Sequence, residues 1–333
     1  MIATGLKTGG SDAFPVAVIR LTAPDGTVGL GETAPSSRYN EDVAGGLAFF
    51  AKVDPARLSF DDVSGSMSYV EQIAPGEFAA KGAINIALLD GAARKAGKPL
   101  HDFLGLGFRD NHHVTTFSIG IDKPEIIRKK TFEAEQYPVL KLKVGGPDDK
   151  ANLAALREAA PKKWVRVDAN EGWKTKEEAL SMIEWLAADG HIQFVEQPMP
   201  AETAPADLVW LKSRSPLPIF ADESYHTEKD VPHCLECYHG VNVKLAKTGG
   251  VTNAYNALSA AREAGLKTMI GCMIETSIII SAAAHLAELT DYLDIDGNLL
   301  INNDPYLGVT AKAGLLSFAN APEKFGLQVS ARG

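Results

Sequence analysis

The sequence predicts an α/β protein in which a (β/α)8-type barrel follows an α+β region. Short β-rich runs alternate with stretches of helical pattern through most of the chain, as in parallel sheets built from βα units. Polar residues recur near the ends of successive runs at intervals of 25, 28, 26 and 22 residues, which a strand, a crossover helix and loops would fill. The sequence contains no complete glycine-rich G-x-G-x-x-G fingerprint after a strand, so a closed barrel is favoured over an open doubly wound sheet.

Composition and charge describe a globular protein of 333 residues, enough for one large domain or two modest ones. Hydrophobic residues make up 45% and charged residues 23%, which excludes disordered and fibrous classes. A net charge of −9 without clustered Lys and Arg excludes nucleic acid as a partner. Three cysteines cannot form a disulfide framework. No apolar run approaches the ~20 residues of a membrane span and no signal peptide is recognisable, so we expect a cytoplasmic protein without a membrane partner.

Two segments give the first hundred residues an α+β character. Residues 16–33 predict a β-hairpin, because two alternating apolar runs flank Asp25-Gly26, a common two-residue turn. Residues 78–96 carry apolar side chains at helical spacing and predict a buried helix, with Pro75 and Gly76 just upstream as a start signal. Strands followed by helices are typical of an α+β unit.

From residue 114 onward the sequence predicts eight strands. They are 114–119 (VTTFSI), 139–144 (VLKLKV), 164–170 (WVRVDAN), 193–198 (QFVEQP), 218–224 (PIFADES), 240–247 (GVNVKLAK), 267–272 (KTMIGC) and 291–297 (DYLDIDG). In a parallel barrel, the polar residues at the C-terminal strand ends point into one shared mouth, where active sites lie. That ring would consist of Lys141, Lys143, Asp168, Asn170, Glu196, Asp222, Lys244, Asp294 and Asp296. Charges within apolar runs are costly unless they are paired or bind ions, so their recurrence at one end of the strands indicates a functional site.

Three consecutive strands contribute one carboxylate each to this ring, from Asp168, Glu196 and Asp222. An all-oxygen cluster without His or Cys suits a hard cation that keeps some of its waters, and Mg²⁺ fits this description. Structural ion pairing is the alternative role for these carboxylates. Their equivalent places on successive strands favour the metal.

Lysines flank the three carboxylates in the order of the strands. Lys141 and Lys143 precede them and share one face of their strand, whereas Lys244 follows them. A metal that holds a carboxylate, with one base on each side of its α-carbon, is a layout for removing the α-proton. A second ammonium ~4 Å away disfavours protonation by up to about 4 kcal/mol at an effective dielectric near 20, so Lys141 is expected to lower the pKa of Lys143. As the alternative, Lys141 would be a solvated lysine at a strand end.

Five motifs resemble the muconate-lactonizing-enzyme subgroup of the enolase superfamily. They are KLKVG at 141–145, VDANEGW at 167–173, VEQP at 195–198, ADES at 221–224 and VNVKLAKTGG at 241–250. GCMIETS at 271–277 and DIDG at 294–297 are similar to dipeptide epimerases of the L-Ala-D/L-Glu type. The resemblance implies a modified (β/α)8 (TIM-type, (β/α)7β) barrel over residues 108–305. It further implies an N-terminal α+β capping domain over residues 1–107, with a C-terminal tail, residues 306–333, packing back on that domain.

The same resemblance implies a Mg²⁺-dependent epimerase. Such an enzyme inverts the α-carbon of the C-terminal residue of a dipeptide like L-Ala-L/D-Glu by a two-base 1,1-proton transfer through an enediolate. Asp168, Glu196 and Asp222 would hold one Mg²⁺, and Lys143 and Lys244 would be the acid/base residues on opposite faces, with Lys141 as helper. o-Succinylbenzoate synthase, N-acylamino-acid racemase and muconate cycloisomerase share this machinery and form the alternative. The substrate would be the small-molecule partner, and a homo-oligomer is expected.

Substrate contacts follow from the resemblance as well. Asp294 and Asp296 would bind the free α-ammonium of the dipeptide; as the alternative, they would cap the turn before Gly297. The hydroxyl of Ser118 and the backbone near Cys272, Met273 and Ile274 would line the pocket. Lys7, in LKT at 6–8, is the candidate for a distal carboxylate or else a solvated lysine. Lys247 is expected outside the mouth, and Asn170, Glu223 and Glu275 are either partners of the site or packing residues.

Overall fold

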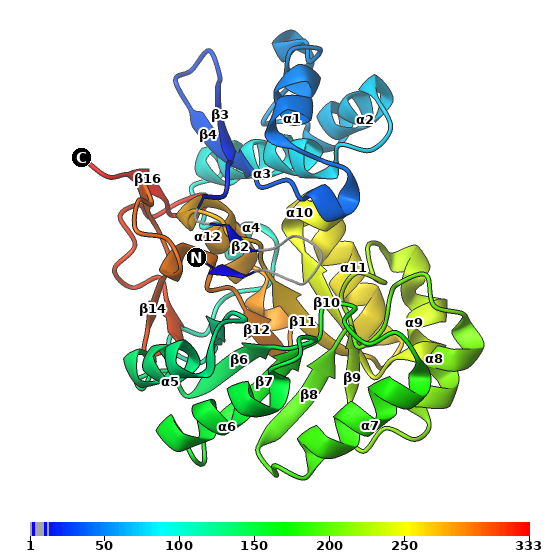
Figure 1. Ribbon diagram of the computed structural model, residues 1–333. Coiled ribbons are helices and arrows are strands. Elements are labelled where there is room, and N and C mark those ends of the chain that lie inside the picture. The colour runs from blue at the N-terminus through cyan, green and yellow to red at the C-terminus, as the bar shows by residue number, and fades with distance from the viewer. Residues whose placement is uncertain (1, 4–9, 12) are drawn as a thin grey trace.

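The computed structural model describes residues 2–3, 10–11 and 13–333 and shows a barrel with a separate layer of strands and helices above it (Figure 1). Eight parallel strands form one sheet in the order β12-β11-β10-β9-β8-β7-β6-β5. Their bounds are β5 Phe117–Ile119, β6 Val139–Lys143, β7 Trp164–Asp168, β8 Ile192–Glu196, β9 Ile219–Ala221, β10 Gly240–Lys244, β11 Lys267–Gly271 and β12 Tyr292–Asp294. All eight predicted strands are thus present, in sequence order around the sheet.

Helices connect the strands on the outside of the barrel (Figure 1). They are α5 Pro124–Glu133, α6 Asp149–Ala159, α7 Lys176–Ala187, α8 Pro205–Lys212, α9 Val231–Cys237 (preceded by the 3₁₀ turn η3, Glu228–Asp230), α10 Leu245–Thr248, α11 Val251–Glu263 and α12 Ser277–Ala284. Another 3₁₀ turn, η4 (Ala287–Leu289), lies between α12 and β12. β12 is followed by a 3₁₀ turn, η5 (Gly297–Leu299), and then by short strands. The described chain therefore has the (β/α)7β pattern, and the predicted fold class is confirmed.

The barrel closes through a short contact between its first and last strands. Thr115 and Leu293 form a parallel bridge, and the amide of Thr116 donates to the carbonyl of Leu293 at 3.3 Å. A side chain completes the junction, since the amide of Ile295 donates to Thr115 Oγ1 at 2.8 Å. We call this junction between β12 and the segment 115–118 the seam.

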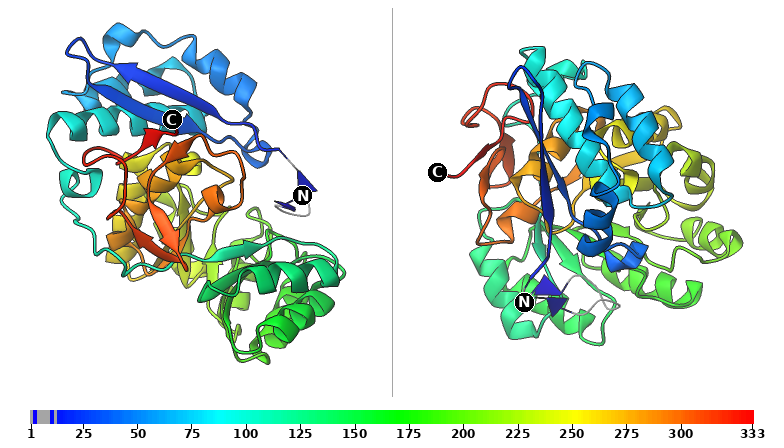
Figure 2. Two further views of the ribbon diagram at one scale, coloured as in Figure 1. Left: turned by 90° about the vertical axis from the view of Figure 1, so that its left-hand side faces the viewer. Right: turned by 90° about the horizontal axis from the view of Figure 1, so that it is seen from above.

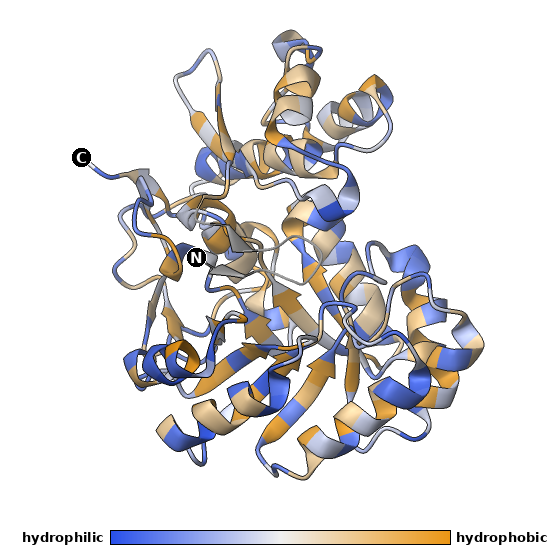
Figure 3. Cartoon of the chain, in the orientation of Figure 1, coloured by the Kyte–Doolittle hydropathy of each residue, from blue (hydrophilic) through white to orange (hydrophobic). Residues whose placement is uncertain are grey.

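Apolar side chains fill the N-terminal half of the barrel interior. Phe194, Phe220 and Met269 form a buried cluster, with Tyr292 packed against it. The Arg166 guanidinium lies over the Tyr292 ring at 4.9 Å and donates to the carbonyl of Leu293 at 2.6 Å. This apolar cluster fills one half of the barrel interior. The charged side chains at the C-terminal strand ends lie in the other half. Figure 3 shows the apolar strands and the polar outer faces of the helices.

The layer above the barrel consists of a β-hairpin and helices. The hairpin is β3 (Ala17–Thr22) paired with β4 (Val28–Thr33), and the helical elements are η1 Ser37–Tyr39, α1 Val43–Phe50, η2 Pro55–Arg57, α2 Val63–Ile73, α3 Phe78–Lys95 and α4 Leu100–Phe103. The predicted hairpin and buried helix are present. The prediction that the hairpin turn has two residues is wrong. The amide of Gly26 donates to the carbonyl of Ala23, and Gly26 has φ +84°. The loop therefore has three residues, Pro24-Asp25-Gly26, because proline favours the first turn position and glycine the left-handed one.

α3 lies directly against β4 because the strand has glycines on that face. A Cβ on Gly29 or Gly31 would lie 2.0 or 1.9 Å from the carbonyl oxygen of Ala87 or Ala83, far inside contact distance. The VGLG run of β4 thus permits the close approach that buries the helix. Below α3, Gly82 lies against the backbone of Gly249 and Gly250 at the start of α11, which joins the layer to the barrel.

Short strands make up the two ends of the described chain. β1 (Ile2–Ala3) pairs with β2 (Gly10–Ser11), and the C-terminal region contains β13 Tyr306–Leu307, β14 Thr310–Lys312, β15 Leu315–Ser317 and β16 Ser330–Ala331. Asp90 of α3 accepts the amide of Leu327 at 2.7 Å, and Val114 pairs with Leu315. The tail therefore contacts both α3 and the beginning of the barrel (Figure 2). Within the described chain, each helix is too short or too polar to cross a bilayer.

Candidate active site

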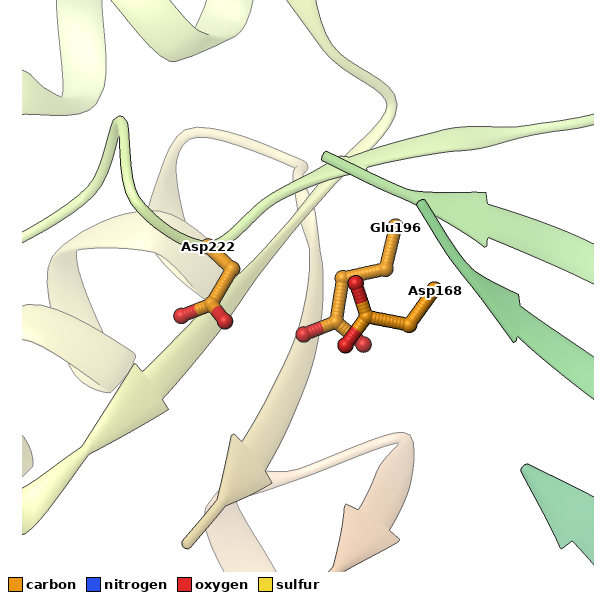
Figure 4. Close-up of side chains that lie close together, drawn as sticks. All are labelled: Asp168, Glu196 and Asp222. Carbon is orange, nitrogen blue, oxygen red and sulfur yellow. The ribbon is translucent and has the colours of Figure 1, made fainter. Parts of the chain in front are cut away.

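Three carboxylates converge at the C-terminal ends of neighbouring strands. Asp168 ends β7, Glu196 ends β8 and Asp222 directly follows β9, and Figure 4 shows their side chains directed toward one another. One oxygen of each lies within 4.8 Å of the others, and all three residues are fully buried. The parallel register explains this meeting, because Asp168 lies opposite Glu196 and Glu196 opposite Phe220, two residues before Asp222.

The donor set fits a hard divalent cation. All three ligand candidates are carboxylate oxygens, which Mg²⁺ prefers over nitrogen or sulfur ligands. Burial and the neighbouring Asp168 charge raise the pKa of Glu196 to about 7, so positive charge at this point would be stabilising. Asp168, although buried, has a pKa of about 2 because Lys141 and Lys143 lie beside it.

Lys141 and Lys143 approach the carboxylates from the β6 side. The Lys141 amine lies 3.0 Å from Asp168 Oδ2, 2.8 Å from Glu196 Oε2 and 2.6 Å from Asp294 Oδ2. Burial disfavours the charge on this amine, but the three carboxylates outweigh it and raise the pKa of Lys141. The Lys143 amine donates to the same Asp168 Oδ2, at 2.6 Å. One oxygen therefore contacts both amines, and the role of Lys141 in tuning Lys143 stays a prediction.

Lys244 approaches from the opposite end of the carboxylate row. It ends β10, is buried, and its amine donates to Asp222 Oδ2 at 2.6 Å. Lys247 contacts the other oxygen, Oδ1, at 2.5 Å and also donates to the carbonyls of Asp222, Tyr225 and Asn242. The expectation that Lys247 lies outside the mouth is thus wrong. The single turn of α10 brings it back beneath the end of β10, where it fixes one oxygen of Asp222.

The two carboxylates of the DIDG motif lie at the seam. Asp294 Oδ1 accepts a hydrogen bond from the hydroxyl of Thr116 while its Oδ2 contacts Lys141, and Asp296 Oδ2 accepts the backbone amide of Ser118 at 2.6 Å. Asp296 precedes η5, yet its side chain makes no capping hydrogen bond there. The alternative of a turn cap is therefore wrong for Asp296. Burial and the Asp294 charge raise the pKa of Asp296 to about 7, so this carboxyl, too, would be stabilised by a cation.

The remaining predicted pocket residues follow β11. Cys272, Met273 and Ile274 form the loop after this strand and are partly buried, and Cys272 Sγ lies 3.9 Å from Asp296 Oδ1. Ser118 reaches Asp296 from β5 through its backbone amide. Lys7 lies outside the described residues.

Asn170, Glu223 and Gln197 link the carboxylate row to the loops. Asn170 Oδ1 accepts the Lys143 amine at 2.9 Å, and its Nδ2 donates to Glu223 Oε1 at 3.3 Å. Gln197, which the sequence analysis did not single out, accepts the amides of Asp222 and Ser224 on its Oε1. The sequence signal that could have identified Gln197 is its position directly after Glu196 in the VEQP motif. Glu275 is buried, and burial with the nearby Glu32 raises its pKa to about 8.

Two family models match the chain and together cover most of it. "Mandelate racemase / muconate lactonizing enzyme, N-terminal domain" matches residues 5–105, and "Enolase C-terminal domain-like" matches residues 127–313. The chain belongs to the mandelate racemase/muconate lactonizing enzyme family. This membership confirms the resemblance to the enolase superfamily that the strand-end motifs indicated.

Members of this family with similar sequences and structures include dipeptide epimerases. An L-Ala-D/L-amino acid epimerase from Pedosphaera parvula is 74% identical over 325 residues, 98% of this chain and 94% of the relative. A dipeptide epimerase from Enterococcus faecalis, complexed with Mg and L-Leu-L-Tyr, is 31% identical with a TM-score of 0.87. The match covers 98% of this chain and 94% of the Enterococcus chain. A dipeptide epimerase from Cytophaga hutchinsonii, complexed with Mg and D-Ala-L-Val, is 29% identical with a TM-score of 0.86. The match covers 95% of this chain and 88% of the Cytophaga chain.

Proposed function

We propose that this family member is a Mg²⁺-dependent dipeptide epimerase, which inverts the α-carbon of the C-terminal residue of a dipeptide. The observation that carries the proposal is that the mouth of the barrel contains two groups of carboxylates that could anchor a substrate. One group is the three converging carboxylates between two lysines, and the other is the pair Asp294 and Asp296 at the seam. The 74% identity to an L-Ala-D/L-amino acid epimerase and the dipeptide complexes of the structural relatives support it.

Asp168, Glu196 and Asp222 would hold the ion. Bound there, Mg²⁺ supplies a Lewis acid for the substrate carboxylate and for the negative charge that develops on it when the α-proton leaves. Lys247 holds Asp222 Oδ1, and Asn242 Nδ2 donates to Glu196 Oε1 at 2.7 Å. These contacts orient two of the three ligands before an ion binds.

Lys143 and Lys244 are the proposed acid/base pair. They contact opposite ends of the carboxylate row, Asp168 on β7 and Asp222 beyond β9. A substrate carboxylate seated on that row would present its α-carbon between the two amines. One lysine then removes the proton from one face and the other, protonated, returns a proton to the opposite face, which inverts the centre.

Asp294 and Asp296 are proposed to bind the α-ammonium of the dipeptide. One peptide unit separates that group from the epimerised residue, since consecutive Cα atoms are ~3.8 Å apart. The Lys141 amine bridges the two anchors, because it contacts Asp168 and Glu196 on one side and Asp294 on the other. Its charge balances part of the negative charge between them, while Asp296 is left to the substrate ammonium through charge-assisted hydrogen bonds.

Blocking the substrate amine is expected to slow turnover sharply. L-Ala-L-Glu and N-acetyl-L-Ala-L-Glu would be compared for α-proton exchange in D₂O, followed by mass spectrometry. Losing the buried charge partner of Asp294 and Asp296 should cost ~2–5 kcal/mol, a drop of about 30-fold or more for the acetylated compound. Equal rates would contradict the role of the carboxylate pair and favour an N-acylamino-acid racemase.

The side chain of the epimerised residue is tested separately. Lys7, if it reaches the site, favours an acidic side chain, so L-Ala-L-Glu is expected to exchange faster than L-Ala-L-Phe. The measurement is the same deuterium uptake at matched substrate concentration, with Lys7→Ala as the comparison. Equal or faster exchange of L-Ala-L-Phe would remove the inference about Lys7 and leave the reaction itself untouched.

A further inference from the structure

A short segment of the N-terminal layer is fastened to the mouth of the barrel by an arginine. Arg38, in η1, donates from Nε to Glu171 Oε2 and from Nη2 to Glu171 Oε1, both at 2.8 Å. Two parallel bonds of this kind form the strongest geometry between a guanidinium and a carboxylate. Nη2 also reaches Glu202 Oε1 at 3.2 Å, but that carboxylate is 72% exposed and contributes little.

Glu171 is also held by contacts on the barrel side. Its side chain is 2% exposed, its Oε1 also accepts the amide of Ala201 at 2.9 Å, and its own amide donates to the carbonyl of Gln197. Removing the guanidinium would leave a buried carboxylate without that cation. Breaking a buried ion pair by removing one partner is strongly destabilising, so the Glu171 side chain would be held less firmly in its place.

The effect would not stay confined to Glu171, because the loop after β7 has an uncommon backbone. Asn170 and Glu171 are consecutive residues with φ of +42° and +64°, in the left-handed region that side chains other than glycine disfavour. The surrounding contacts must supply the energy that keeps both residues there. The Arg38–Glu171 pair is one of those contacts.

The neighbour of Glu171 touches a proposed acid/base residue. Asn170 accepts the Lys143 amine on Oδ1 at 2.9 Å, and its amide donates to Asp168 Oδ1 at 2.9 Å. Lys244 makes no such contact with this loop; its hydrogen bond goes to Asp222 on the far side of the carboxylate row. The loop that Arg38 secures therefore contacts one of the two proposed acid/base lysines directly and the other only through intervening residues.

We propose that Arg38 is a positioning residue for Lys143: its ion pair with Glu171 keeps the Asn170–Glu171 turn in the conformation in which Asn170 receives the Lys143 amine. The inference rests on the proposed two-base epimerisation. In this proposal, a residue of the N-terminal layer helps to position the lysine that transfers the proton on one face of the substrate. The consequence is an asymmetry, because loss of Arg38 acts on one face of the substrate.

The test measures α-proton exchange in D₂O from each epimer of L-Ala-Glu separately. Lys143→Ala identifies the epimer whose proton Lys143 removes, as the one that no longer exchanges. In Arg38→Ala, kcat for exchange of that epimer should fall at least tenfold, while exchange of the other epimer stays within about twofold. Arg38→Lys, which keeps the charge but cannot form the paired bonds, should fall in between.

Matched controls separate positioning from general damage. Arg128 forms an exposed ion pair with Glu158 at 2.7 Å, so Arg128→Ala makes the same chemical change away from the mouth and should leave both rates unchanged. Glu202→Gln removes the weaker partner of Arg38 and should also leave them unchanged. Glu171→Gln should reproduce the asymmetry, and adding Arg38→Ala to it should cause no further loss.

Two results would overturn the inference. An equal fall for both epimers in Arg38→Ala and Arg38→Lys would mean that Arg38 supports the fold or the mouth as a whole. Unchanged rates for both epimers would mean that Asn170 keeps its place without the ion pair. Wild-type protein that exchanges neither epimer of any dipeptide would instead overturn the proposed function, and this inference with it.

Discussion

Lys244→Ala is expected to abolish epimerisation while α-proton exchange of one epimer continues. Lys143→Ala should show the reverse, retaining exchange only of the opposite epimer. Inversion requires a proton donor and a proton acceptor on opposite faces, whereas exchange at one face requires only the lysine on that face. Removing one such group lowers the affected rate by about 10²–10⁴-fold. Polarimetry measures inversion, and deuterium uptake measured separately for each epimer resolves the two faces.

A surface lysine provides the control for this pair of variants. Lys267, at the start of β11, is 60% exposed and contacts Asp291, so Lys267→Ala should leave inversion and exchange unchanged. Lys244→Ala with near-normal inversion would contradict the two-base mechanism. Loss of exchange for both epimers, with the fold intact by circular dichroism, would assign Lys244 to metal or substrate binding instead.

Removing the metal is expected to stop the reaction completely. EDTA should abolish exchange for both epimers, and Mg²⁺ should restore it, as should Mn²⁺, because both suit a set of carboxylate oxygens. Asp222→Asn should weaken Mg²⁺ binding in calorimetry and eliminate turnover, because the amide offers the ion a neutral oxygen in place of a charged one. The structural basis is the position of Asp222, whose two oxygens contact one lysine each, Oδ2 on Lys244 and Oδ1 on Lys247.

Asp207→Asn is the matched control for the carboxylate. Asp207 is 41% exposed and contacts Lys176 on the outside of the barrel, so this variant should bind Mg²⁺ and turn over like wild type. Full activity in metal-free protein would contradict the metal assignment. Retained Mg²⁺ affinity in Asp222→Asn would show that the ion is held elsewhere.

The strand ends could be predicted from the sequence because a parallel barrel imposes a simple rule. Each βα unit returns the chain to the same rim, so charged residues near the ends of successive apolar runs must meet there. That rule was sufficient for Asp168, Glu196 and Asp222, which the structure brings within 4.8 Å. It also placed Lys143 and Lys244 on either side of them.

The rule fails where a loop or a helical turn redirects the chain. Lys247 follows β10, and its place depends on the single turn of α10, which strand periodicity does not describe. Gln197 and Asn170 have positive φ values, and no simple pattern predicts left-handed backbone for residues other than glycine. The Arg38–Glu171 pair joins residues 133 apart in sequence, so only the packing of the N-terminal layer on the barrel reveals it.

The seam has a consequence for how such an enzyme can diversify. The proposed metal ligands and both proposed bases follow one another on β6 to β10, whereas Asp294 and Asp296 contact Thr116 and Ser118 across 178 residues of sequence. The residues proposed for the reaction and those proposed for substrate recognition thus lie on separate arcs of the rim, which the Lys141 amine joins. Mutations that alter the seam can exchange the amine anchor for a site that accepts another substrate end. Because the proposed proton-transfer residues lie on the other arc, such mutations leave them in place, so enzymes with the same reaction can differ in the molecules they invert.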